Sequence, residues 1–139
     1  MAYLLDTNAC IALINGSQSS VRGRFSKAIH NGAEIYTSSI VLFELWYGVE
    51  KSSRPQANTE RIAMFLSGPV GMLPFDETDA HAAGAVRATL EGMGKPIGAY
   101  DLLIAGQALA RKMTLVTCNL REFSRVKGCL LYTSDAADE

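Results

Sequence analysis

A short apolar run near the start of the chain stops abruptly at a carboxylate. The run Tyr3-Leu4-Leu5 is followed by Asp6, and Thr7-Asn8 then lead into the apolar segment 9–14. The run is too short and too apolar for a half-exposed strand, so it predicts a buried strand, followed by a helix that Thr7 or Asn8 caps. Asp6 would then lie at the carboxyl end of a strand, where open α/β sheets bind their ligands.

Segments typical of strands and helices alternate along the rest of the chain. Further strands are expected at 34–38, 70–75 and 114–117. The intervening helical segments are expected at 20–30, 39–48, 58–66, 76–92 and 98–110. Because parallel strands need a crossover between them, this alternation predicts a mostly parallel sheet inside a three-layer α/β/α sandwich.

Composition sets limits on the class of protein. The chain has 139 residues, of which 48% are hydrophobic and 19% charged, as expected for one globular domain. Its formal net charge of −1 gives no bulk attraction for nucleic acid, so an RNA or DNA partner would require metal ions or a local basic patch. No apolar run approaches the length of a membrane span, and we expect a soluble, cytoplasmic protein without a membrane partner.

The end of the chain departs from the preceding pattern. Residues 129–139 resemble the translation of a common sequencing-library adapter. We therefore expect one domain over residues 1–128, followed by a non-native tail over residues 129–139.

Two further acids interrupt apolar runs. Glu44 lies between Val41-Leu42-Phe43 and Leu45-Trp46-Tyr47, and Asp101 lies within the apolar segment 99–105. A salt bridge or a helix cap would satisfy any one of these acids equally well. Three acids that converge at one edge of a sheet would repel one another unless cations separated them, and carboxylate oxygens suit Mg²⁺ or Mn²⁺.

Four segments, taken in order, resemble the motifs of the PIN-domain nucleases, and among these the VapC toxins of bacterial toxin–antitoxin pairs. The resemblance covers about residues 2–128, and it rests on Asp6-Thr7-Asn8, on segment 39–48, on segment 97–105 and on segment 115–123. Any one of these motifs is weak evidence, but four in the same order at matching spacing are specific. The resemblance implies a PIN-like sandwich with four to five strands.

The resemblance also implies a reaction. Asp6, Glu44 and Asp101 would hold Mg²⁺ or Mn²⁺, and Asn119 would help with a neutral oxygen where many relatives have an acid. Cleavage of an RNA phosphodiester bond would proceed by attack of a metal-activated water, without a covalent intermediate. The resemblance points to tRNA or ribosomal RNA as substrates.

Three hydroxyl or amide side chains are candidates for a supporting role. Thr7 and Asn8 could orient ligands or water from one side of the site, and Thr117 could do so from the other. The alternative for Thr117 is an ordinary β-branched strand residue.

The resemblance implies partners as well. We expect a VapB-like antitoxin, a homodimer or a larger toxin–antitoxin assembly, and contact with operator DNA only through the antitoxin. Two alternatives remain open: a catalytically weak subunit of a DNA-binding toxin–antitoxin complex, and a metal-dependent phosphatase. The second is disfavoured by Asn8, since the common phosphatase signature has an acid two positions after the first Asp.

Other conspicuous residues are better explained by structure. Asp76 and Asp79 are spaced as in the first turn of a helix, which favours capping over metal binding. Several aromatic and sulfur-containing side chains at near-helical spacing are expected in the core or at a subunit interface. They are Phe43, Trp46, Tyr47, Met64 and Phe65.

Overall fold

The computed structural model describes residues 1–16 and 19–133. In chain order these residues form β1 (Ala2–Leu5), α1 (Thr7–Asn15), α2 (Ser19–His30), β2 (Glu34–Ser38), α3 (Ser39–Glu50), α4 (Pro55–Leu66), β3 (Gly71–Leu73), α5 (Glu77–Gly92), α6 (Ala99–Ala110), β4 (Thr114–Thr117), α7 (Leu120–Phe123) and β5 (Leu131–Thr133). Within this part of the chain, no helix has both the length and the apolar character that a bilayer span requires.

The five strands form one parallel sheet in the order β3-β2-β1-β4-β5. This confirms the predicted α/β class and the four to five parallel strands. The chain steps outward from β1 to β2 and β3, then crosses to β4 on the other side of β1. The strand order therefore reverses between β1 and β4, and open α/β folds bind ligands at the carboxyl end of such a point.

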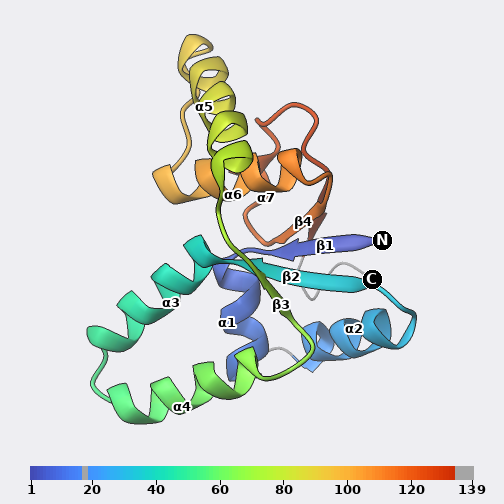
Figure 1. Cartoon of the computed structure of the whole chain (residues 1–139), viewed down its shortest axis with the longest axis vertical. Coiled ribbons are helices and arrows are strands. Elements are labelled where there is room, and N and C mark those ends of the chain that lie inside the picture. Colours follow the sequence, from blue (N-terminus) through green and yellow to red (C-terminus); the bar gives the residue numbers. More distant parts are fainter. Residues whose placement is uncertain (17–18, 134–139) are drawn as a thin grey trace.

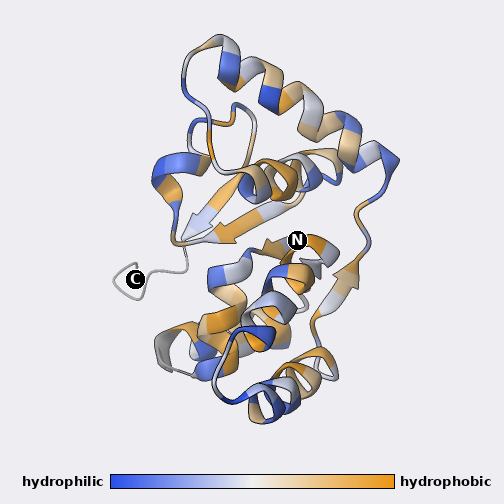
Figure 2. Cartoon of the chain, turned by 90° about the vertical axis from the view of Figure 1, so that its left-hand side faces the viewer, coloured by the Kyte–Doolittle hydropathy of each residue, from blue (hydrophilic) through white to orange (hydrophobic). Residues whose placement is uncertain are grey.

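Helices cover both faces of the sheet (Figure 1). α5, α6 and α7 lie on one side of the strands, while α1, α2, α3 and α4 lie on the other. Apolar residues dominate the strands between these layers, as the orange colouring of Figure 2 shows. The fully buried side chains at the centre include Leu4, Val41, Ile104, Leu115 and Phe123.

Two predicted boundaries were wrong for identifiable reasons. α4 begins at Pro55 rather than after Asn58, because proline is well suited to the first turn of a helix, where its missing N–H leaves no bond unmade. β3 is shorter than the predicted strand 70–75. Pro74 has no N–H to donate, and the backbone N–H of Phe75 donates instead to Ser39 Oγ at 3.0 Å.

The last strand uses residues that the sequence assigned to the tail. Leu131–Thr133 pair with β4 in parallel, with Leu115 opposite Leu131 and Thr117 opposite Thr133. Residues 134–139 of the expected tail lie outside the described residues. The fifth strand of the sheet is thus built from part of segment 129–139, whatever the origin of that segment.

Candidate active site

Asp6 follows β1 directly and is almost fully buried, with 4% of its surface exposed. Its carboxylate accepts a hydrogen bond from the backbone N–H of Ala9 at 2.8 Å, which makes Asp6 the N-cap of α1. The expected caps, Thr7 and Asn8, were wrong, because the carboxylate one residue earlier already satisfies a free N–H of the first turn. Asp6 is therefore fixed in direction by the helix that it caps.

Burial raises the pKa of Asp6 above its usual value. A hydrogen bond from the fully buried Thr117 and the bond from Ala9 partly oppose this effect, while the nearby charge of Glu44 adds to it. Thr117 also accepts a hydrogen bond from the backbone N–H of Asn119 at 2.8 Å. The Thr117 hydroxyl thus links the end of β4 to the Asp6 carboxylate.

Glu44 reaches the same place from α3. The hydroxyl of Thr7 donates a short hydrogen bond to Glu44 Oε1, which ties the first turn of α1 to the middle of α3. Glu44 is half-buried, whereas Asn8 is exposed on the first turn of α1. Of the two polar residues that follow Asp6, Thr7 is the one in contact with a site carboxylate.

Asp101 enters from the first turn of α6. It is half-buried, and the side-chain amide of Asn119 donates to its Oδ2 at 3.5 Å, a long and weak contact. In this arrangement the nitrogen of Asn119 faces Asp101. A role for Asn119 as an oxygen ligand would require its amide to turn over.

A fourth carboxylate, Glu122, was missed from the sequence. Burial, then a hydrogen bond with Glu122 and its charge, raise the pKa of Asp101 to about 6, and the charges of Asp6 and Glu44 add to the rise. Glu122 lies on α7, a single helical turn too short to show periodicity. Its position three residues after Asn119, on the same side of a helical turn, was the available signal.

The site therefore collects four carboxylates from four elements: Asp6 after β1, Glu44 on α3, Asp101 on α6 and Glu122 on α7. Every neighbouring carboxylate raises the pKa of Asp101, which means that ionised side chains repel one another here. Among the described residues, no three His, Cys, Asp or Glu side chains stand close enough to form a ready-made metal cage. The donor set is nonetheless all oxygen, and a divalent cation would relieve the repulsion.

Asp76 and Asp79 have the structural role expected of them. Each accepts a hydrogen bond from the backbone of the other at the start of α5, a capping box. Asp79 is fully buried and binds the Arg111 guanidinium at 2.9 Å. Burial alone would raise the pKa of Asp79, but the Arg111 and backbone hydrogen bonds outweigh it and lower the value.

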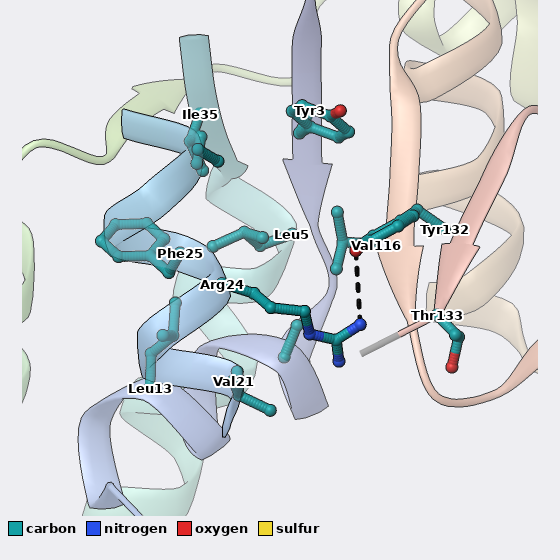
Figure 3. Close-up of a pocket in the computed structure, with 12 residues that line it drawn as sticks. Tyr3, Leu5, Leu13, Val21, Arg24, Phe25, Ile35, Val116, Tyr132 and Thr133 are labelled. Atoms are coloured by element: carbon teal, nitrogen blue, oxygen red, sulfur yellow. Dashed lines mark hydrogen bonds between the residues drawn. The ribbon is translucent and has the colours of Figure 1, made fainter. Parts of the chain in front are cut away.

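A separate cavity of about 150 Å³ lies between α1, α2 and the sheet (Figure 3). Most of its lining is apolar, including Leu13 and Phe25. At one side of the cavity, Nη1 of Arg24 donates a hydrogen bond to the Tyr132 hydroxyl at 3.3 Å. None of the four site carboxylates lines it. The cavity is therefore distinct from the carboxylate site.

Comparison with known proteins identifies the family of the chain. A sequence model of the PIN domain matches residues 3–128. The chain belongs to the PIN-domain family. A 41% identical relative is the tRNA(fMet)-specific endonuclease VapC of Shigella flexneri, aligned over 92% of this chain and 94% of that protein. Ribonuclease VapC2 of Rickettsia felis is 39% identical over 97% of this chain and 99% of its own length.

Solved PIN-domain structures share the architecture. VapBC2 from Rickettsia felis, bound to a DNA fragment from its promoter, superposes with a TM-score of 0.91 at 38% identity, over 97% of this chain and all of that one. DNA-bound VapBC from Salmonella typhimurium gives a TM-score of 0.88 at 38% identity, over 97% and 99% of the two chains. The expected PIN-like fold is confirmed.

Proposed function

We propose that this PIN domain is the toxin of a toxin–antitoxin pair and cleaves RNA as a Mg²⁺- or Mn²⁺-dependent endoribonuclease. The observation that carries the proposal is the convergence of Asp6, Glu44, Asp101 and Glu122 at the point where the strand order of the sheet reverses. The names of the VapC relatives, which are ribonucleases and a tRNA endonuclease, support the same activity.

The proposed roles follow from the contacts. Asp6, Glu44, Asp101 and Glu122 would hold the metal, which when bound neutralises charge on the phosphate and activates water for attack at phosphorus. Thr7 holds Glu44 in place, and Thr117 holds Asp6.

Protons and charge in the site follow from the same contacts. Below about pH 6 the raised pKa of Asp101 keeps a proton on this carboxyl in the metal-free protein, and that proton would leave when a cation binds. The side-chain amide of Asn119 donates its hydrogen bond to Oδ2 of Asp101.

The proposed partners are RNA, a VapB-like antitoxin and a second copy of the toxin, all in the cytoplasm. The solved VapBC complexes with DNA support operator binding as an activity of the toxin–antitoxin complex. Because this chain carries a net charge of −1, we assign most of the DNA contact to the antitoxin. The phosphatase alternative is not favoured, since the exposed Asn8 supplies no second acid beside Asp6.

The test is to incubate the protein with total bacterial RNA in Mg²⁺, in Mn²⁺ and in EDTA, and to map the ends of any products. We expect a small number of discrete cuts in the presence of metal, with initiator tRNA the first substrate to examine. RNA that stays intact in every metal condition, with a protein shown to be folded, would refute the proposal.

A further inference from the structure

Two aromatic rings stand exposed beside the carboxylate site. Phe43 of α3 is 53% exposed and Tyr100 of α6 is 45% exposed. Their ring centroids lie 5.4 Å apart with the planes tilted by 58°. The sequence predicted a core or interface position for Phe43, and its exposure in the folded chain rules out the core. Adjoining apolar surface of this kind commonly marks a contact site.

The position of the pair relates it to the site. Phe43 immediately precedes Glu44, and Tyr100 immediately precedes Asp101. Consecutive helix residues project about 100° apart, so each ring lies to the side of its neighbouring carboxylate. Glu44 and Asp101 are close enough for the charge of Glu44 to raise the pKa of Asp101. The two rings therefore form an apolar border along one side of the acidic site.

We propose that Phe43 and Tyr100 form a platform on which one unpaired nucleobase stacks, next to the phosphodiester bond that the carboxylates cleave. This inference rests on the proposed ribonuclease function. Carboxylates can engage a phosphate through a cation, but they offer no flat apolar face on which a base can stack. Aromatic faces bind bases of any sequence, but only where the base is free of a helix. The platform would thus select looped or single-stranded RNA.

A subunit interface is the competing explanation, and Tyr47 separates the two. Tyr47 lies one turn beyond Phe43 on α3, is 59% exposed, and has the Lys51 ammonium 4.8 Å from its ring centre. A protein partner lying along α3 would cover Tyr47 as well as Phe43. A single base held at the carboxylate site would contact Phe43 and Tyr100 only.

The experiment measures binding of a fluorescein-labelled single-stranded RNA by fluorescence anisotropy. Each substitution is made in an Asp6→Asn background to prevent cleavage. We expect Phe43→Leu and Tyr100→Leu each to weaken binding by roughly 5- to 150-fold, the range for loss of one stacked base. The matched control, Tyr47→Leu, should change affinity less than about twofold. The same substitutions without Asp6→Asn should lower kcat/KM for RNA cleavage to a similar extent.

An RNA with one abasic position adds a second readout. Moving the abasic position along the strand should reveal one site where loss of the base weakens binding to the Asp6→Asn protein but not to the Asp6→Asn protein that also carries Phe43→Leu. An equal loss of RNA affinity in all three leucine variants, together with a change in the mass of the protein assembly measured by sedimentation, would overturn the inference in favour of a subunit interface.

The remaining outcomes separate this inference from the function on which it rests. RNA cleavage and binding that are insensitive to Phe43→Leu and Tyr100→Leu would overturn the platform and leave the ribonuclease proposal intact. A parent chain that neither binds nor cleaves RNA would overturn both.

Discussion

At the scale of single residues, Asp101 combines burial with an acidic neighbour. Its pKa is raised to about 6 from the ordinary value of 3.8, first by burial and then by Glu122. Between these two pH values the folded protein keeps a proton that the unfolded chain has released. The free energy of unfolding therefore falls as the pH rises through this window. The ionised carboxylate is then a continuing cost to stability above about pH 6, unless a cation binds.

This argument predicts a pH-dependent difference between the metal-free protein and its Asp101→Asn variant. Relative to the variant, the parent protein should lose thermal stability as the pH rises from about 4 to about 7, because only the parent has an Asp101 to ionise. Calorimetry in EDTA at several pH values measures this. Asp79, whose pKa is lowered, loses its stabilising effect only below that window. Parallel curves for the two proteins would contradict the assignment.

Arg111 is the counter-charge of a buried acid, and its removal should be costly. Its side chain is 28% exposed, but Asp79 beneath it is only 1% exposed. Arg111→Met should lower the free energy of unfolding by about 3 kcal/mol, since it leaves Asp79 buried and unpaired. Urea denaturation measures the loss, and adding Asp79→Asn should recover much of it.

The exposed pair Arg87–Glu91 provides the control for that prediction. Its side chains are 68% and 56% exposed, so Arg87→Met should cost less than about 1 kcal/mol. A loss as large as that of Arg111→Met would show that burial of the acid is not the cause.

Three of the four carboxylates of the candidate site could be predicted because each interrupts an apolar run. An acid surrounded by leucine, phenylalanine or alanine must find a partner on folding, so Asp6, Glu44 and Asp101 are visible without a structure. Glu122 stands in a polar stretch and carries no such signal. The capping role of Asp6 was also missed, because Thr7 and Asn8 are also common helix caps and stand next to it in the sequence.

At the scale of elements, α5 and α6 pack closely enough to exclude a methyl group. A Cβ placed on Gly106 would lie 2.5 Å from the backbone of Ala83. Gly106→Ala should therefore force the helices apart and lower the free energy of unfolding by about 1–3 kcal/mol. Because α6 carries Asp101, RNA cleavage should fall as well. Urea denaturation and a cleavage assay check the two effects.

Gly84 on the neighbouring helix is the matched control. A Cβ there would meet no atom within 4 Å. Gly84→Ala should leave stability unchanged or raise it by about 1 kcal/mol through helix propensity. If both alanine variants behaved alike, the close approach of Gly106 to Ala83 would not explain the result.

The order and type of the long elements could be predicted from hydrophobic periodicity, whereas short elements and edges could not. β5 has three residues and α7 has four, too few for a period to appear. The boundaries of α4 and β3 depend on Pro55 and Pro74. A proline can stand in a loop, in the first turn of a helix or at the end of a strand, and the sequence alone does not decide between these positions.

At the scale of the whole molecule, the sheet depends on the segment after Gly128. Leu131–Thr133 cover one edge of β4, and Tyr132 packs beside Tyr3 with ring centroids 6.1 Å apart. Ending the chain at Gly128 should expose the edge of β4 and lower the melting temperature by several degrees. A thermal melt of the shortened protein measures this. An unchanged melting temperature would show that the tail contributes nothing to the fold, as expected of a non-native addition.

The central claim is that the carboxylate cluster hydrolyses RNA, and Asp6→Asn tests it most directly. Asparagine caps a helix about as well as aspartate, so this substitution removes the charge while α1 keeps its cap. Asp76→Asn, at the cap of α5, is the matched control away from the site. We predict metal-dependent RNA cleavage by the parent protein and by Asp76→Asn, with a loss of at least about 100-fold in Asp6→Asn. Undiminished cleavage by Asp6→Asn would contradict the account.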